Sequence, residues 1–169
     1  ALAATIATRD YGSGVARFIS RAKAGAALKV VGIGDSILAG TGATLGVNDT
    51  LTRLIEALAV TYPDATITQQ NRAVSGSTTA IAGIGGTFDT ALTDAGDLYV
   101  IGFGRNDVQA DAYPGQPVQG YARERSLRYL EVMIRAVRAE VPQADILLYT
   151  ENPTTSYAGD ALMRTYQAG

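Results

Sequence analysis

The chain has 169 residues, of which 47% are hydrophobic and 18% charged, and this is the composition of a globular domain rather than a disordered segment. Its formal net charge is −2, with acidic and basic residues interspersed, so no nucleic acid and no anionic membrane surface is indicated as a partner. There is no cysteine and no histidine, which excludes disulfides, thiolate chemistry and the usual general base near neutral pH within these residues. No apolar run approaches the roughly 20 residues that span a bilayer.

Apolar strands and amphipathic helices alternate along the sequence. An almost unbroken apolar run that stops at glycine, such as Leu28–Ile33 before Gly34, is typical of a strand buried on both faces. The clearest helix, over about 121–140, has an apolar stripe made of Leu127, Leu130, Met133/Ile134 and Val137. In chain order we expect a helix over 14–24, a strand over 28–33, a helix from Thr50 that Pro63 ends, a strand over 65–69, a helix over 78–91, a strand over 98–103, a helix over 121–140, a strand over 145–149 and a last helix over 159–167.

This alternation predicts an α/β fold in which a parallel sheet is sandwiched between two layers of helices. We expect a three-layer α/β/α sandwich of flavodoxin-like strand order 2-1-3-4. No repeat period or linker divides the chain, so we count a single domain over residues 1–169. In such sheets the functional site lies beyond the carboxyl ends of the strands, where loops from several strands converge.

Three short polar segments follow three consecutive predicted strands. They read Gly34-Asp35-Ser36-Ile37, Asn71-Arg-Ala-Val-Ser-Gly76 and Gly104-Arg105-Asn106-Asp107. In this order they resemble the sequence blocks of the SGNH/GDSL hydrolase family, and the resemblance extends from about Ala27 onward. It implies a serine esterase whose catalytic residues are Ser36 as the nucleophile, Gly76 as a backbone N–H donor and Asn106 as a side-chain amide donor.

Elementary chemistry agrees with these implied roles. A serine on a sharp turn after a buried strand presents its hydroxyl to the crevice, and its attack on an ester carbonyl creates an oxyanion. That charge needs preorganised donors roughly 2.7–3.1 Å away, which the N–H groups of Ser36 and Gly76 and the amide of Asn106 could supply. A glycine suits such a site because its bare backbone can approach the substrate closely. We expect Asp35 and Asp107 to tie their loops by local hydrogen bonds.

The sequence departs from the family in its last block. That block is Asp-x-x-His after a fifth strand and holds the general base, but nothing here matches it. We therefore expect a domain truncated at its C-terminus, nearly inactive alone, whose strand at Asp145–Tyr149 is covered by a C-terminal segment or a second chain. Glu151 is an alternative base, although a pKa near 4.3 makes an ordinary glutamate a poor one. Lys29 lies about 23 Å from Ser36 along an extended strand and is out of reach.

Other motifs are weaker. The run Val31-Gly-Ile-Gly34 begins like a dinucleotide fingerprint, but Ile37 stands where the third glycine belongs. Ser75 and Ser77 are possible nucleophiles, and hydrogen bonding within their loop explains them better.

The resemblance implies hydrolysis of short acyl esters, and we expect acetyl groups on a carbohydrate as the substrate. Small polar loop residues permit a sugar there: Ser75, Ser77, Thr78 and Thr79. No metal or organic cofactor is implied. A catalytically inactive binding or structural module of an envelope or phage-tail protein is the alternative, and a secreted, envelope or virion-associated location is favoured.

Overall fold

The computed structural model describes residues 14–83, 87–107 and 121–149. Its elements are α2 (Ala16–Lys23), β1 (Ala27–Gly34), α3 (Thr50–Thr61), β2 (Thr66–Asn71), the 3₁₀ helix η2 (Thr79–Gly83), α4 (Thr87–Thr93), β3 (Leu98–Gly102), α6 (Tyr121–Glu140) and β4 (Asp145–Tyr149). The predicted boundaries of α6 and β4 are confirmed. The helix expected over 159–167 and the alternative base Glu151 lie outside the described residues.

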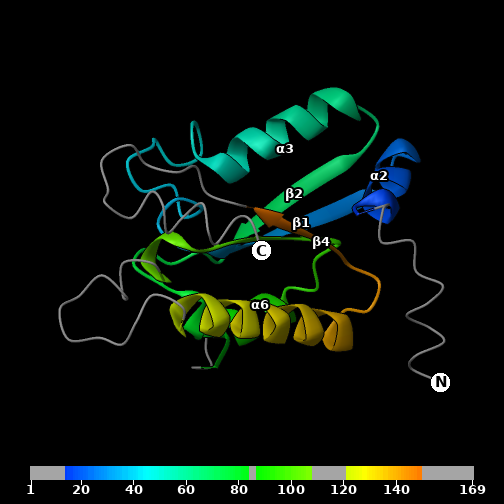
Figure 1. The fold of residues 1–169 in the computed structure, drawn as a ribbon. Coiled ribbons are helices and arrows are strands. Elements are labelled where there is room, and N and C mark those ends of the chain that lie inside the picture. Colours follow the sequence, from blue (N-terminus) through cyan, green and yellow to red (C-terminus); the bar gives the residue numbers. More distant parts are fainter. Residues whose placement is uncertain (1–13, 84–86, 108–120, 150–169) are drawn as a thin grey trace, which may run out of the picture.

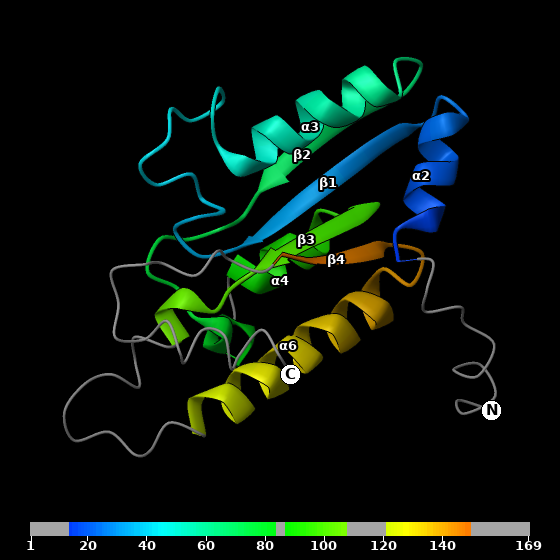
Figure 2. The same ribbon diagram turned by 45° about the horizontal axis from the view of Figure 1, so that its top comes forward.

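The four strands form one parallel sheet in the order β2-β1-β3-β4, which confirms the predicted order and fold class. Helices α2 and α3 lie on one face of this sheet and α4 and α6 on the other, so the fold has three layers (Figure 1 and Figure 2). Since every strand runs in the same direction, the segments after β1, β2 and β3 all emerge at the same end of the sheet, beyond the carboxyl ends of the strands.

The two central strands supply apolar side chains to both layers of helices. In β1, Val30 belongs to the core under α2 and α3, whereas Val31 belongs to the core under α4 and α6. The same alternation separates Val100 from Tyr99 and Ile101 in β3. Because successive strand side chains point to opposite faces, a strand that is covered on both sides must be apolar throughout.

The helix predicted over 78–91 is wrong as one element, since η2 and α4 are separate helices. Gly83, Gly85 and Gly86 fall between or at the ends of these two pieces, and glycine weakens a helix because of its backbone freedom. None of the described helices is long and apolar enough to cross a membrane.

The expected buried stripe of α6 is corrected at one position. Leu127 is 43% exposed, whereas its neighbour Ser126 is buried. The stripe that faces the core is Ser126, Leu130, Met133 and Val137, spaced 4-3-4. The polar residue Ser126 occupies one buried position of this stripe. The hydrophobic pattern therefore predicted its apolar neighbour Leu127 as the buried residue instead.

Strand β4 lies at the edge of the sheet formed by the described residues, where it pairs with β3. Its side chains Leu147 and Leu148 are 39% and 47% exposed. That a further segment covers this edge therefore stays a prediction.

Candidate active site

The first loop of the site begins where β1 ends. The Asp35 N–H donates to the carbonyl of Gly102 in β3 at 3.1 Å, which holds the chain one residue beyond the strand. The chain then turns sharply, because the Thr41 N–H donates to the Ser36 carbonyl at 2.8 Å. The Asp35 Oδ1 atom accepts from the Ile37 N–H at 2.9 Å, the local bond that we expected from this side chain. Ser36 therefore lies on a hydrogen-bonded turn.

The turn bonds the carbonyl of Ser36 but uses neither the hydroxyl nor the N–H of this residue. Its side chain is half-buried, and among the described residues neither its hydroxyl nor its N–H has a hydrogen-bond partner. Directly beside it Asp35 is fully buried, and its Oδ2 atom is the buried side-chain oxygen without a partner in the described part of the chain. A hydroxyl and an N–H without partners can both be used by a ligand.

The second loop, after β2, is fastened to the end of β1. The Val74 N–H donates to the Gly34 carbonyl at 2.9 Å, and the Ser77 hydroxyl lies 2.9 Å from the same carbonyl oxygen. The Ser75 hydroxyl lies 2.6 Å from that of Thr41, in the loop after β1. Both serines thus make the loop hydrogen bonds expected of them.

Gly76 lies between these two serines and has the geometry of an exposed donor. Its φ angle is +82°, a conformation that side-chain-bearing residues rarely adopt, and the space next to its Cα is open. Its N–H has no backbone acceptor in the described part of the chain. Gly76 is therefore an exposed residue whose N–H is not used by the described backbone.

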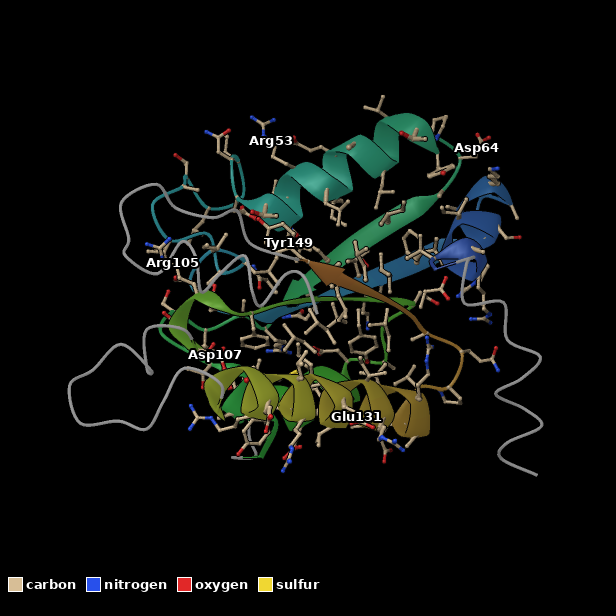
Figure 3. The ribbon with its side chains drawn as sticks, in the orientation of Figure 1. Arg53, Asp64, Arg105, Asp107, Glu131 and Tyr149 are labelled. Carbon is tan, nitrogen blue, oxygen red and sulfur yellow. The ribbon has the colours of Figure 1, made fainter. Side chains whose placement is uncertain are left out.

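The third segment, after β3, turns into a helix at Arg105 and is fastened to the second loop. The Asn106 Nδ2 atom donates to the Ser77 carbonyl at 2.8 Å. An amide nitrogen carries two protons, so this bond fixes the side chain and leaves one proton for a ligand. Arg105 and Asp107, the two neighbours of Asn106 in sequence, are labelled in Figure 3 and lie at the same end of the molecule.

Asp107 makes bonds of longer range than the local ones expected. Its carboxylate accepts from the N–H and the hydroxyl of Thr79 and from the hydroxyl of Ser126, which lie 28 and 19 residues away in sequence. Thr79 is 1% exposed, so the interpretation of this side chain as part of a sugar-accepting loop is wrong.

Other charged groups have structural partners. The pKa of Asp94 is lowered, mainly by its hydrogen bonds with the Arg72 guanidinium and against the effect of burial. The pKa of Asp49 is lowered, mainly by the N–H of Thr52 at the start of α3. The Lys29 ammonium donates to the Asp94 carbonyl. Among the described residues no group of three or more acidic side chains, histidines or cysteines could hold a metal ion.

A cavity of about 280 Å³ opens beside the first two loops. It is lined by Ala39, Leu45, Gly46, Asp49, Thr52, Gln69, Asn71 and Ala73. Its polar groups bond to their own surroundings: Asp49 accepts from Thr52, Gln69 donates to Thr52, and Asn71 donates to the Leu38 carbonyl. These bonds build the first turn of α3 and the end of β2, and we assign the cavity no chemistry.

Residues 33–168 match the GDSL-like Lipase/Acylhydrolase family. A search of curated proteins finds no match. Among solved structures, a two-domain esterase (CEX) active on acetylated mannans, co-crystallised with mannopentaose, is 23% identical with a TM-score of 0.69, over 89% of this chain and 37% of that one. Axe2, an acetylxylan esterase from Geobacillus stearothermophilus, is 20% identical with a TM-score of 0.63, over 83% of this chain and 68% of that one. A catalytic mutant of Axe2, with a serine replaced by alanine, is 20% identical with a TM-score of 0.62, over 83% of this chain and 67% of that one.

Proposed function

Because the chain belongs to the GDSL-like lipase/acylhydrolase family and is an ester hydrolase of that family, we propose that it cleaves short acyl esters through an acyl-Ser36 intermediate. The observation that carries this proposal is the joining of the three segments after β1, β2 and β3 at the end of β1, two residues before Ser36. Among the described residues the Ser36 hydroxyl has no hydrogen-bond partner, and the segments of Gly76 and Asn106 are bonded to the end of β1 and to each other.

The proposed reaction uses these groups in two steps. The Ser36 Oγ atom attacks the carbonyl carbon of the ester and loses its proton to a base, while the carbonyl oxygen becomes an oxyanion. The N–H groups of Ser36 and Gly76 and the second amide proton of Asn106 stabilise that charge. Collapse expels the alcohol, which takes up a proton, and water then releases the acid from the serine by the same route.

The mechanism also needs a general base, and the 169 residues lack the side chain that usually serves as one. They contain no histidine, and hydrogen bonds lower the pKa values of Asp49 and Asp94, which moves these two carboxyl groups away from the neutral range. We propose that an Asp-x-x-His segment following Gly169 in the natural protein provides it, with Glu151 as the alternative.

For the substrate we propose an acetyl ester of a carbohydrate. The support comes from the two esterases of the same fold, one active on acetylated mannans and one an acetylxylan esterase. The catalytic mutant of the latter, which replaces a serine, supports a serine nucleophile at Ser36. An inactive binding module is not favoured, because the matching family and the solved structures reported above are ester hydrolases.

Release of acetate from acetylated xylo-oligosaccharides and manno-oligosaccharides tests the proposal, with p-nitrophenyl acetate as a general ester. In the natural full-length protein we expect Ser36→Ala to abolish turnover while leaving the far-UV circular dichroism spectrum unchanged. Ser75→Ala, a matched change of a neighbouring loop serine, should retain turnover. Full activity in Ser36→Ala would show that Ser36 is not the nucleophile. If Ser75→Ala is inactive while Ser36→Ala remains active, Ser75 is the nucleophile instead.

The base is tested separately, by comparing the 169-residue chain with the same chain carrying its natural extension. A catalytic apparatus without its base retains roughly 10³–10⁴-fold catalysis over water, from binding and oxyanion stabilisation. We expect the 169 residues to show esterase activity near this level and the extended chain to exceed it by several orders of magnitude. Full activity of the 169 residues alone would instead favour Glu151 as the base.

A further inference from the structure

Asp107 is a buried carboxylate at which three segments of the chain meet. It is 1% exposed and lies directly after Asn106. Its Oδ1 atom accepts from the Thr79 hydroxyl at 2.5 Å and from the Ser126 hydroxyl at 2.8 Å, and both of its oxygens lie 3.2 Å from the Thr79 N–H. Thr79 begins η2 and Ser126 belongs to α6, so the carboxylate joins the end of the β3 loop to two helices.

A second bridge runs parallel to the first. Asn106 donates to the Ser77 carbonyl, two residues before Thr79. Two consecutive residues after β3 therefore hold two points of the segment that directly follows Gly76. Such a pair of bridges fixes the distance between the two loops and also their relative rotation, which one hydrogen bond could not do.

We propose that Asp107, acting through Thr79 and Ser126, is a positioning residue that sets the placement of Gly76 and Asn106 relative to each other. This inference rests on the proposed function, in which these two residues supply oxyanion donors. Asp107 itself touches no substrate, because it is buried beneath the loops. Its contribution is geometric: donors act only within a few tenths of an ångström of the oxyanion position, and a misplacement of 1 Å can cost about a hundredfold in rate.

The chemistry of the carboxylate fits this role. Burying a charge is costly unless it is hydrogen-bonded, and here one carboxylate accepts three donor groups from two helices. An apolar side chain of similar size could fill the space but could orient neither Thr79 nor Ser126. Because η2 packs against α6, the carboxylate also fixes the loop of Gly76 to the longest helix of the described chain.

Steady-state kinetics of the natural full-length protein on p-nitrophenyl acetate test this inference. We expect Asp107→Asn to lower kcat by about tenfold to a hundredfold with KM within about twofold. The amide places a donor opposite the Thr79 N–H in the position of Oδ2, and it removes the negative charge that strengthens the two hydroxyl bonds at Oδ1. Thr79→Ser, which keeps the hydroxyl, should retain the native kcat. Thr79→Val, which removes the hydroxyl, should lower kcat. Asp49→Asn is the matched control, since Asp49 also accepts the N–H and hydroxyl of one threonine, Thr52, but supports α3; it should leave kcat unchanged.

A double-mutant cycle with Asn106→Ala separates positioning from a general loss of stability. If Asp107 acts through the oxyanion donors, Asp107→Asn should cost much less in the Asn106→Ala background than in the native protein. Equal costs in both backgrounds would overturn the inference. If Asp107→Asn does not fold, Ser126→Ala replaces it in the same cycle, with the same expected result.

The two proposals fail in different ways. If Ser36→Ala and Asn106→Ala keep full kcat, the proposed function is wrong. If both lower kcat while Asp107→Asn, Ser126→Ala and Thr79→Val do not, the proposed function stands and the positioning role of Asp107 is wrong.

Discussion

Gly34, the last residue of β1, is a point where adding one methyl group should damage both the fold and the site. A Cβ atom at this position would lie 2.4 Å from the carbonyl oxygen of Gly102 in the neighbouring strand, and 2.9 Å from the Cβ atom of Leu38. The Gly102 oxygen is the same atom that accepts the Asp35 N–H and so fixes the turn carrying Ser36. Gly34→Ala therefore tests whether this close approach of two strands holds the proposed nucleophile.

The geometry sets the size of the effect. Carbon and oxygen atoms approach to about 3.3 Å, so the two strands must separate by about 0.9 Å where the Cβ atom meets the Gly102 oxygen. Overpacking of this kind costs about 1–3 kcal/mol, and loss of the Asp35 hydrogen bond adds about 0.5–1.5 kcal/mol. The reduced freedom of alanine in the unfolded chain offsets about 0.4–1 kcal/mol. Together these contributions lower the free energy of unfolding of Gly34→Ala by about 0.5–4 kcal/mol, with a central value of about 2 kcal/mol.

Urea unfolding followed by far-UV circular dichroism measures this free energy, and kcat on p-nitrophenyl acetate should fall with it. Gly32→Ala is the matched control in the same strand. Its Cβ atom would meet the Cδ2 atom of Leu51 at 2.9 Å, the end of a side chain rather than backbone, so its net cost should be below about 1 kcal/mol. If the two variants are equally stable, or if Gly34→Ala keeps native kcat, the reasoning about this contact is wrong.

Two further changes have expected outcomes. Asn106→Ala should lower kcat by about 10²–10³ with a smaller effect on KM, because its amide acts mainly on the oxyanion; unchanged kcat would exclude it from the oxyanion hole. The hydrogen bonds of Arg72 lower the pKa of Asp94, so the stability that this carboxylate contributes is present above about pH 4 and is lost as the pH falls through its folded-state pKa. Urea unfolding should therefore show a stability difference between wild type and Asp94→Asn that is larger at pH 7 than at pH 3, and an equal difference at both values would contradict the assignment.

The central place of β1 and β3 and the two layers of helices could be predicted because these two strands have a simple sequence pattern. Each is an apolar run bounded by glycine, and each contributes to both cores. The convergence of the three loops followed from the same pattern, since parallel strands end at one end of the sheet. Hydrophobic periodicity and the residues that end each apolar run were therefore enough to predict this part of the fold.

The bonds within the site could not be predicted in the same way. The partners of Asp107 are a threonine and a serine far along the chain, and neither carries a pattern that announces it. Ser126 lies four residues before Leu130 and completes the buried stripe of α6. The hydrophobic pattern instead favoured its neighbour Leu127, which is apolar but exposed. Long-range pairing of polar groups depends on packing, which a single sequence does not display.

The exposed edge at β4 and the proposed base are connected by geometry. The proposed donors Gly76 and Asn106 follow the strands on either side of β1, so we expect the base to reach the Ser36 hydroxyl over the open end of the sheet. A further strand pairing with β4 would lie three strands from β1, about 14 Å away at the usual spacing of about 4.8 Å. We therefore expect the proposed Asp-x-x-His segment to follow a strand that pairs with β4 and then to cross the ends of β4 and β3. Successive amides of a strand point to opposite sides, so of the neighbouring Leu147 and Leu148 amides one faces β3 and the other faces the open edge. Hydrogen exchange of the edge-facing amide measures this pairing, with slower exchange expected in the extended chain than in the 169 residues. Equal exchange in both, with esterase activity present only in the extended chain, would show that the base arrives without covering β4.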